Sequence, residues 1–237
     1  MRGDGDGWAT SPDGRRHWGR HGAAGLLLRA PLDDGTPAVL LQHRAAWSHQ
    51  GGTWALPGGA RDSHESTAHA AVREAHEEAG IDPASVDVRA EVVTMRVPGG
   101  WSYTTVLAET YSLLDTVPNG ESTELRWVRE AEVAAMPLHP GFADGWLRLQ
   151  TRPVRLLVDG DSIAADVPAR VPRIVALPDG AFGWISEIAR SSALGEGTFG
   201  AVTPSRDGAL TAVLSADGAL LERLPASVVT LTPPPLG

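Results

Sequence analysis

Residues 63–80 constrain the fold most, because they carry the start signal, the face and the end signal of one amphipathic helix. Asp62 is a candidate N-cap with Glu65 three residues later, and Gly80 follows the last apolar position. These signals predict a helix over residues 63–79. On a helical projection, one arc gathers the small apolar side chains Ala68, Ala71, Val72, Ala75 and Ala79. Such a face predicts that the helix packs on a sheet.

The same helix carries three glutamates, Glu74, Glu77 and Glu78, in neighbouring positions. Like charges three or four residues apart on a helix cost about 0.2–0.5 kcal/mol per pair, and the negative end of the helix dipole disfavours them further. A solvated acidic face is the alternative explanation, but the third glutamate and the adjacent Gly-rich loop weigh against it. Hard cations such as Mg²⁺ or Mn²⁺ compensate such a cluster, so the pattern predicts a metal site.

Composition narrows the class of protein. The chain has 237 residues, of which 42% are hydrophobic, enough for one good core and a smaller appended unit. The net charge is −9 and all 20 basic residues are arginine without a basic stripe, which argues against a nucleic-acid polymer as partner. The absence of cysteine excludes disulfides and thiolate sites. Neither a leader pattern nor a bilayer-spanning run stands out, so we expect a cytoplasmic protein without a membrane partner.

Strand-like and helix-like segments alternate up to about residue 150, which predicts an α/β unit. A hairpin is expected at WATSPDGRRHWG, and a short helix at REAEVAAM before Pro137. The expected strands are AAGLLLRA, PAVLLQHR, VDVRAEVVTMRV, WSYTTVLAETYSL and ELRWV.

Residues 59–81, GARDSHESTAHAAVREAHEEAGI, resemble a complete Nudix box. Every defined position of that motif is filled, by Gly59, Glu65, Arg73, Glu74, Ala75, Glu77, Glu78, Gly80 and Ile81. The flanking segments QHR, GGTWALPGG and ELRWV are similar to those of MutT-like hydrolases, and the resemblance covers about residues 18–150. It implies a Nudix α/β/α sandwich with a mixed sheet as a domain of residues 1–150. Residues 151–237 would form a C-terminal accessory domain.

The resemblance also implies an activity, the hydrolysis of a nucleoside diphosphate linked to another moiety by metal-activated water. Phosphoryl and nucleotidyl transfer need charge neutralisation and positioning, which a carboxylate cage with Mg²⁺ or Mn²⁺ supplies. By the family pattern Glu77 and Glu78 are the principal metal ligands, whereas Glu74 either binds metal or accepts the proton of the attacking water. Arg73 would orient the glutamates, and Glu65 would be structural. The carbonyl of Gly58 is a further expected ligand, and Gly59 leaves room for the phosphates.

A distal acid and a phosphate contact are expected outside the box. Glu121 sits where MutT-like enzymes carry a glutamate that binds metal or serves as general base, and Glu124 is the competing candidate. Glu121 is preferred because it falls in the loop before a strand. Arg44 matches a phosphate-contacting arginine at the end of its strand, with a surface ion pair as the alternative.

The substrate's variable part is expected to meet aromatic side chains. Trp101 and Tyr103, flanked by PGG, are candidates for a wall on which a base stacks, with core filling as the alternative for any tryptophan. Phe142 lies near where related enzymes hold the nucleobase. An ungapped count places it where MutT-type enzymes use an asparagine for oxidised guanine, which weighs against 8-oxo-dGTP. Pro98 is similar to the proline of ADP-ribose pyrophosphatases, at a slightly different spacing.

Two functional hypotheses follow for this nucleotide-binding unit. One is an Mg²⁺-dependent pyrophosphohydrolase, with an ADP-ribose-type pyrophosphatase as a variant. The other is a nucleotide-sensing or regulatory protein in which the C-terminal unit delivers the output. The intact glutamate set favours the enzyme, because a pure sensor does not need it.

Residues 151–237 predict a small β-rich or α+β unit of hairpins, with one helix at WISEIARSSAL. Within it, GEGTFG at residues 195–200 spells a dinucleotide-binding pattern, but the expected strand before it and helix after it are missing. Covering the active site, forming a homodimer and binding a separate partner all stay open as roles of this unit.

Overall fold

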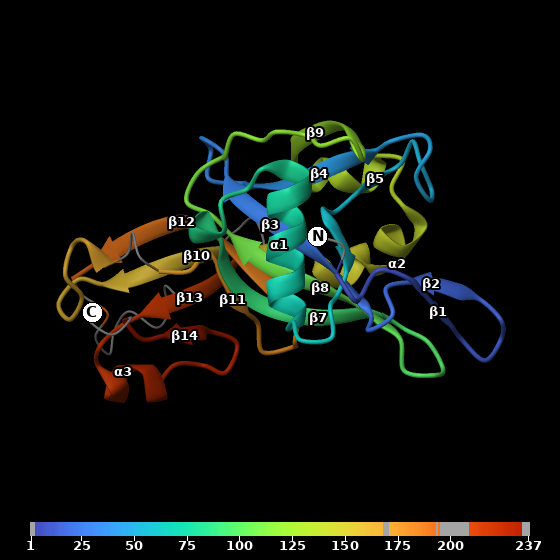
Figure 1. Ribbon diagram of the computed structural model, residues 1–237. Coiled ribbons are helices and arrows are strands. Elements are labelled where there is room, and N and C mark those ends of the chain that lie inside the picture. Colours follow the sequence, from blue (N-terminus) through green and yellow to red (C-terminus); the bar gives the residue numbers. More distant parts are fainter. Residues whose placement is uncertain (1–2, 168–170, 193, 195–208, 234–237) are drawn as a thin grey trace. The chain divides into compact units, whose positions relative to one another are not determined.

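The computed structural model of the protein describes residues 3–167, 171–192, 194 and 209–233 (Figure 1). The contacts divide the chain into two compact units, which are described separately below. Unit 1 comprises Met1–Leu32 and Pro37–Leu147, and unit 2 comprises Asp33–Thr36 and Arg148–Gly237. The division into independent domains near residue 150 stays a prediction.

Unit 1 contains most of the regular structure. Its strands are β1 Trp8–Thr10, β2 Arg16–Trp18, β3 Ala23–Pro31, β4 Pro37–Arg44, β5 Trp54–Ala55, β6 Gly58–Ala60, β7 Asp87–Arg96, β8 Ser102–Glu109 and β9 Ser122–Arg129. Its helices are α1 Thr67–Ala79, the 3₁₀ turns η1 Pro83–Ser85 and η2 Glu130–Ala135, and α2 Pro140–Leu149, which ends in unit 2. None of the helices in the described ranges is long and apolar enough to cross a membrane.

The main sheet of unit 1 is mixed. Its strand order is β5-β4-β3-β8-β7, with β6 paired to β3 and β9 paired to β4. Strands β3 and β8 run parallel, with Ala23 opposite Tyr103, whereas the β3–β4 and β7–β8 pairs are antiparallel. The predicted hairpin is present as β1 and β2, with Trp8 opposite Trp18. The expected α/β class with a mixed sheet is confirmed.

Helix α1 lies across β3 and β8 (Figure 1). One buried cluster joins their side chains, namely Ala24, Leu26, Leu28, Val106 and Ala108 of the strands with Ala70, Ala71, Ala75 and Ala79 of the helix. The expected packing of a small-residue face on a sheet is therefore correct. The face is rotated slightly from the predicted arc, because Ala70 is fully buried while Ala68 and Val72 are only partly buried.

The predicted start of α1 is wrong and its predicted end is right. The helix begins at Thr67, and the N-cap is Ser66, whose hydroxyl accepts the His69 N–H at 3.1 Å. Asp62 does not cap the helix, because its carboxylate accepts the Gly5 N–H at 2.7 Å instead. Gly80 ends the helix in the left-handed conformation (φ 70°), as its position predicted.

Helix α2 was not expected from the sequence. Gly141 and Gly145 lower its intrinsic propensity, and Pro140 suits only its first turn. Its signal is the spacing of Phe142, Trp146 and Leu149, which are buried at helical intervals. Packing therefore outweighs propensity here.

Unit 2 is built on a five-stranded sheet. Its elements are β10 Thr151–Asp159, β11 Ile174–Ala176, β12 Phe182–Ser191, β13 Leu210–Leu214, α3 Gly218–Glu222 and β14 Val229–Leu231. The strand order is β11-β12-β10-β13-β14, and only the β11–β12 pair is antiparallel among the described strands. A unit of hairpins was therefore the wrong expectation. Parallel neighbours need crossover connections, which turn signals alone do not predict.

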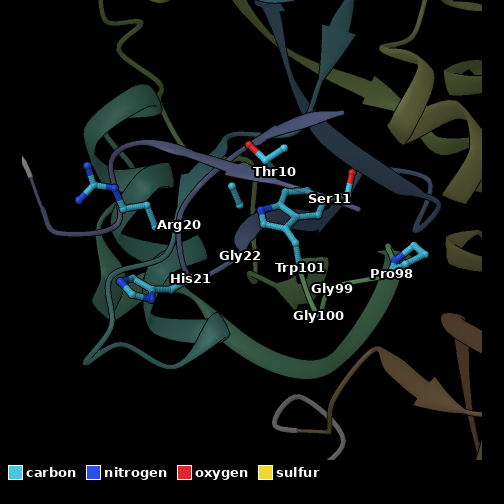
Figure 2. A pocket seen from close by; sticks show the side chains of 10 residues that line it. Thr10, Ser11, Arg20, His21, Gly22, Pro98, Gly99, Gly100 and Trp101 are labelled. Carbon is cyan, nitrogen blue, oxygen red and sulfur yellow. The ribbon is translucent and has the colours of Figure 1, made fainter. Parts of the chain in front are cut away.

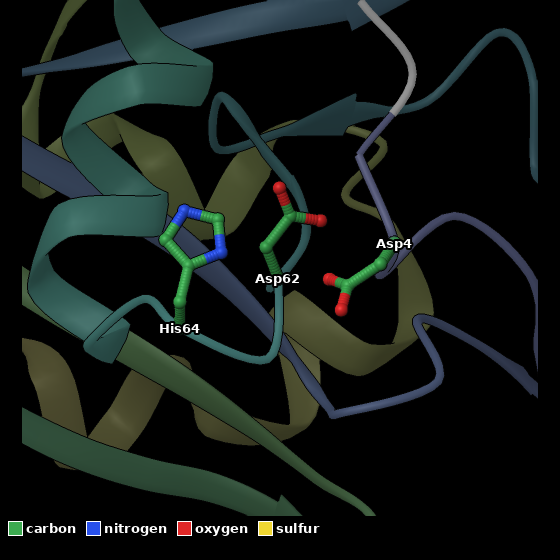
Figure 3. A group of neighbouring side chains, drawn as sticks. All are labelled: Asp4, Asp62 and His64. Atoms are coloured by element: carbon green, nitrogen blue, oxygen red, sulfur yellow. The ribbon is translucent and has the colours of Figure 1, made fainter.

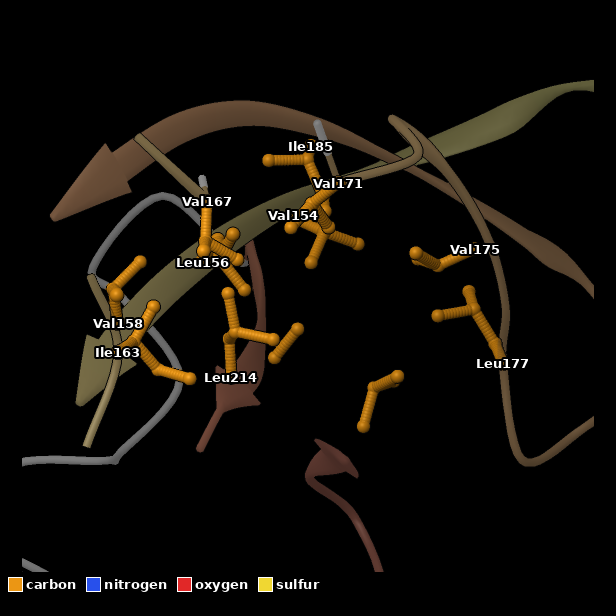
Figure 4. Close-up of a cluster of buried hydrophobic side chains, with 12 residues drawn as sticks. Val154, Leu156, Val158, Ile163, Val167, Val171, Val175, Leu177, Ile185 and Leu214 are labelled. Atoms are coloured by element: carbon orange, nitrogen blue, oxygen red, sulfur yellow. The ribbon is translucent and has the colours of Figure 1, made fainter. Parts of the chain in front are cut away.

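The helix expected at residues 184–194 is also wrong, because residues 184–191 belong to strand β12. Trp184 and Ile185 are buried there, and aromatic and β-branched residues favour strands. The GEGTFG segment lies outside the described residues. The unit has its own apolar core, which includes Val154, Leu156 and Leu214 (Figure 4).

Candidate functional site

Glu78 lies buried at the end of α1, with 4% of its surface exposed. Its Oε2 accepts the Gly58 N–H at 2.7 Å and the Gln42 side-chain amide at 3.1 Å. Both donors are neutral. Burial, opposed by the Gly58 hydrogen bond and reinforced by the charges of Glu74 and Glu121, raises the pKa of Glu78 to about 8. This carboxylate is therefore costly to ionise unless a cation approaches it.

Glu74 lies beside it against the glycine loop, with 15% of its side chain exposed. Arg73 Nη1 donates to Glu74 Oε1 at 2.9 Å. Burial nevertheless outweighs the Arg73 charge and, with the neighbouring charges of Glu77 and Glu121, raises the pKa of Glu74 to about 7. A Cβ at Gly59 would lie only 2.6 Å from the Glu74 carboxylate, so this position needs glycine for the carboxylate to stay where it is.

Arg73 connects the acidic pair to the loop before the helix. Its Nε and Nη2 donate to the two carboxylate oxygens of buried Glu65, at 2.7 and 3.0 Å. Nη2 also donates to the carbonyl of Ala60 at 2.9 Å. Such a bidentate pair fixes the guanidinium plane and, with it, the oxygen of Glu74. The orienting role of Arg73 and the structural role of Glu65 stay predictions, which these hydrogen bonds support.

Glu77 points elsewhere. Its side chain is 57% exposed, and its Oε2 lies 3.6 Å from Arg73 Nη1. Within the described ranges, Glu74, Glu77 and Glu78 do not bring their oxygens within 4.8 Å of one another as a group. Mutual repulsion and the Arg73 cation account for this spread. The buried pair still offers the carboxylate oxygens that hard divalent cations prefer, and Glu77 can complete the set by turning away from Arg73.

The structure separates the two candidates for the distal acid. Glu121 lies in the loop before β9, and its charge raises the pKa of both Glu74 and Glu78. Asn119 positions this loop by accepting the Glu121 N–H at 2.8 Å. Glu124 forms an ion pair with Arg126 instead. Glu121, the preferred candidate, is thus the one brought near the acidic pair.

Arg44 stands at the end of β4, as predicted. Its Nε donates to the carbonyl of His49 at 3.0 Å, and its charge lowers the pKa of Glu78. This partner is a carbonyl rather than a carboxylate. The position therefore fits a guanidinium that faces the site.

Trp101 and Tyr103 do not form one wall. Tyr103 is partly buried, and a Cβ at Gly25 would overlap its hydroxyl oxygen. Burial and the charge of Glu78 raise the pKa of Tyr103, so its hydroxyl lies toward the acidic pair. The Trp101 indole N–H donates instead to the carbonyl of Gly19, the residue after β2, at 2.8 Å. The expected common stacking surface is therefore a wrong prediction.

Phe142 belongs to the core of α2. It is 8% exposed and packs edge-on against Trp146, with ring centroids 5.4 Å apart. The prediction that Phe142 contacts the base is therefore corrected. The ungapped count that placed it opposite an asparagine did not foresee a buried helix face.

Gln42 is a site residue that sequence reasoning missed. Its amide nitrogen donates to Glu78, and its carbonyl oxygen accepts the Ser122 hydroxyl at 2.6 Å. The signal was present, because Gln42 is a polar residue within the apolar strand PAVLLQHR and buried polar groups have partners.

A separate group of possible ligands lies near the N-terminus, where Asp4, Asp62 and His64 place one ligand atom each within 4.8 Å of the others (Figure 3). Hydrogen bonds already account for this arrangement. Asp4 accepts the Ser63 N–H at 2.9 Å and Asp62 accepts the Gly5 N–H at 2.7 Å, so the group ties the N-terminal segment to the loop before α1.

Comparisons with known proteins agree with this fold. The NUDIX domain family matches residues 19–149. A protein of Mycobacterium tuberculosis (strain ATCC 25618 / H37Rv) named "Putative 8-oxo-dGTP diphosphatase 3" is 58% identical over 188 residues, covering 78% of this chain and 85% of that protein. The crystal structure of RenU, a Nudix hydrolase from M. smegmatis, is 64% identical with a TM-score of 0.60, covering 61% of this chain and 92% of that one.

The mixed sheet covered by α1 is the α/β arrangement of Nudix hydrolase structures. The chain belongs to the Nudix family, in its MutT-like branch, and is a pyrophosphohydrolase. Proteins of this family generally use a divalent metal and act on small nucleotide substrates.

Proposed function

We propose that this protein hydrolyses a nucleoside triphosphate or a related nucleoside diphosphate derivative in an Mg²⁺-dependent reaction. The observation that carries the proposal is the buried acidic pair Glu74 and Glu78, whose pKa values are raised to about 7 and about 8. Two such groups do not stabilise the folded protein, because the burial of each carboxyl disfavours its ionised form. A bound divalent cation removes that cost and leaves the pair as ligands.

The residues take the following parts. Glu78 and Glu74 would hold the metal together with Glu77 and the carbonyl of Gly58. When bound, a divalent ion neutralises phosphate charge and lowers the pKa of a water molecule. Arg73 keeps the Glu74 carboxylate in place through its 2.9 Å hydrogen bond, and Glu74 accepts the proton of the attacking water.

The remaining contacts serve the phosphates. Glu121 is the second acidic group that faces the pair, and its exposed loop lets it act as ligand or base. Arg44 presents a guanidinium that neutralises a phosphate at the end of β4. Gly59 leaves the space in which phosphates approach the backbone.

The first substrate to test is 8-oxo-dGTP, because the M. tuberculosis relative carries that name. The burial of Phe142 removes the sequence argument against it, since that side chain is held in the core of α2. ADP-ribose is the second substrate to test, because Pro98 is similar to the proline of ADP-ribose pyrophosphatases.

The test is a turnover screen of 8-oxo-dGTP, dGTP and ADP-ribose with Mg²⁺, with Mn²⁺ and with EDTA, following release of phosphate, pyrophosphate and nucleoside monophosphate. We expect metal-dependent turnover of at least one nucleotide, loss of turnover in Glu78→Gln, and retention in the matched variant Glu124→Gln. Nucleotide binding without any turnover would overturn the proposal and favour a sensing protein.

A further inference from the structure

A cavity of about 250 Å³ lies at the edge of unit 1, where the β1–β2 hairpin meets the start of β3 and the turn before β8 (Figure 2). The side chains that line it include those of Thr10, Ser11, Arg20, His21 and Trp101. The reaction proposed for the acidic pair does not use any of these residues.

We propose that this cavity receives the nucleobase end of the nucleotide whose diphosphate is hydrolysed at Glu74 and Glu78. The inference rests on the proposed function and assigns the part of the substrate that the acidic pair does not contact.

The lining of the cavity offers groups that bind nucleobases. Trp101 supplies an aromatic face, and Arg20 supplies a planar cation. Aromatic and guanidinium planes stack on nucleobases of any sequence. Thr10 adds a hydroxyl that both donates and accepts, which suits the edge of a base. A planar, polar-edged ligand therefore fits this lining better than an aliphatic one.

Trp101 is held rigidly by its neighbours. Its indole N–H donates to the carbonyls of Gly19 at 2.8 Å and Trp18 at 3.2 Å. Its ring stacks on His17, with centroids 4.7 Å apart and planes 28° apart. A ring held by hydrogen bonds and by stacking loses little entropy when a ligand binds, so the surface is preorganised.

A short stretch of backbone connects the cavity to the acidic pair. Gly22, at the cavity, is two residues before Ala24, which pairs with Gly59 across β3 and β6. Two residues of strand span roughly 7 Å. A Cβ at Gly59 would in turn lie 2.6 Å from the Glu74 carboxylate, so Gly59 is next to the acidic pair. A nucleotide in an extended form has its base and its phosphates separated by a sugar, which suits this spacing.

A second connection runs through Arg61. Its guanidinium donates to the carbonyl of His21 at 2.6 Å and to the carbonyl of Glu65 at 2.9 Å. Glu65 is the residue that holds Arg73. The rim of the cavity and the guanidinium that orients Glu74 are thus fixed to the same loop, so a ligand spanning both meets a single rigid frame.

The size of the cavity limits what enters it. Pockets that bury a whole drug-sized ligand hold about 300–1,000 Å³. At about 250 Å³ this cavity suits a base with part of its sugar and leaves the phosphates outside, at the glutamates. The β1–β2 hairpin precedes residues 19–149, so three of the ten lining residues, Ala9, Thr10 and Ser11, lie outside the matched family domain. The cavity is therefore placed to set specificity rather than chemistry.

The test compares nucleotides with a ligand that lacks a base. Equilibrium binding of 8-oxo-dGTP, dGTP and inorganic tripolyphosphate is measured by calorimetry with Ca²⁺ in place of Mg²⁺, and KM and kcat are measured with Mg²⁺. Trp101→Ala removes the aromatic face, and Ala9→Trp fills the cavity without deleting a packing contact. Arg16→Gln, on the same hairpin but outside the lining, is the matched control.

We expect Trp101→Ala and Ala9→Trp to raise the nucleotide Kd and KM at least tenfold, with kcat within about threefold and tripolyphosphate affinity unchanged. Arg16→Gln should match the wild type. Nucleotide Kd and KM unchanged in Ala9→Trp, or nucleotide and tripolyphosphate weakened equally, would overturn the inference. Absence of turnover in the wild type would overturn the proposed function alone, because the binding arm still reports on the cavity.

Discussion

Replacing Glu78 by Gln separates the cost of the buried carboxylate from its use. Glutamine keeps an oxygen that accepts the Gly58 N–H and the Gln42 amide, and it removes the ionisable group. We therefore expect the Glu78→Gln protein to fold, to be more stable than the wild type without metal, and to lose activity.

The magnitude follows from the pKa of Glu78, which rises from 4.5 to about 8 on folding. Above pH 4.5 the unfolded chain releases a proton that the folded chain keeps, so the stability of the wild type falls as pH rises from 4.5 to about 8. A pH of 7 lies about 2.5 units above the pKa of the unfolded carboxyl, and at about 1.4 kcal/mol per unit this difference lowers the stability of the folded wild type by about 3 kcal/mol. Glu78→Gln avoids this loss, so its gain is near zero at pH 4 and about 3 kcal/mol at pH 7.

The assay is urea denaturation in EDTA at pH 4, 6, 7 and 8, with both proteins followed by tryptophan fluorescence. A gain of about 3 kcal/mol corresponds to a rise in Tm of roughly 6–12 °C for a chain of this size. Adding Mg²⁺ should then stabilise the wild type and leave the stability of Glu78→Gln almost unchanged, because only an ionised carboxylate at this position binds the cation strongly. Turnover should fall at least about a hundredfold.

The control is Glu77→Gln, whose parent side chain is 57% exposed and therefore carries little burial cost. It should show no gain that grows with pH. A stability difference between Glu78→Gln and the wild type that does not change with pH would refute the burial argument. Normal turnover in Glu78→Gln would refute the assignment of Glu78 to the metal.

Three further predictions test other parts of the site and the core. Gly59→Ala should fold but lose about a hundredfold in kcat, because its Cβ displaces the Glu74 carboxylate; unchanged kinetics would contradict this. Glu121→Gln should lower kcat at least about tenfold whereas Glu124→Gln stays within about twofold, and equal effects would remove Glu121 from the site. Arg29→Met should lower the free energy of unfolding by about 3–5 kcal/mol in urea titrations, because it removes the buried cation that pairs with Glu130; a loss below 1 kcal/mol would contradict this.

The glutamates could be located from the sequence because their spacing is a local property of one helix. Gly80 fixed the end of α1 for the same reason, since its left-handed conformation suits glycine. The start was misplaced because Asp62 and Ser66 are both good N-caps, and the choice between them depends on contacts far along the chain. The Gly5 N–H takes the Asp62 carboxylate and leaves Ser66 to cap the helix.

The distal contacts were harder because they depend on register and on packing. Trp101 and Tyr103 are two residues apart and would share a face if both lay in a strand. Strand β8 begins at Ser102, so Trp101 turns toward the hairpin while the partly buried Tyr103 lies in the strand. In unit 2, β10 pairs with β12 rather than with its chain neighbour β11. No turn signal encodes that order.

The opposing charges around α1 explain why the acidic helix holds together without being neutral. Glu65 and Arg73 form the compensated part, with hydrogen bonds of 2.7 and 3.0 Å between two charged groups. Glu78 forms the less compensated part, because both of its donors are neutral and burial outweighs the charge of Arg44. The deeper a carboxylate is buried, the more stability its ionisation costs and the more strongly a cation is favoured beside it. We therefore predict that a substitution at Glu78 changes both the stability measured in EDTA and the affinity for a divalent ion.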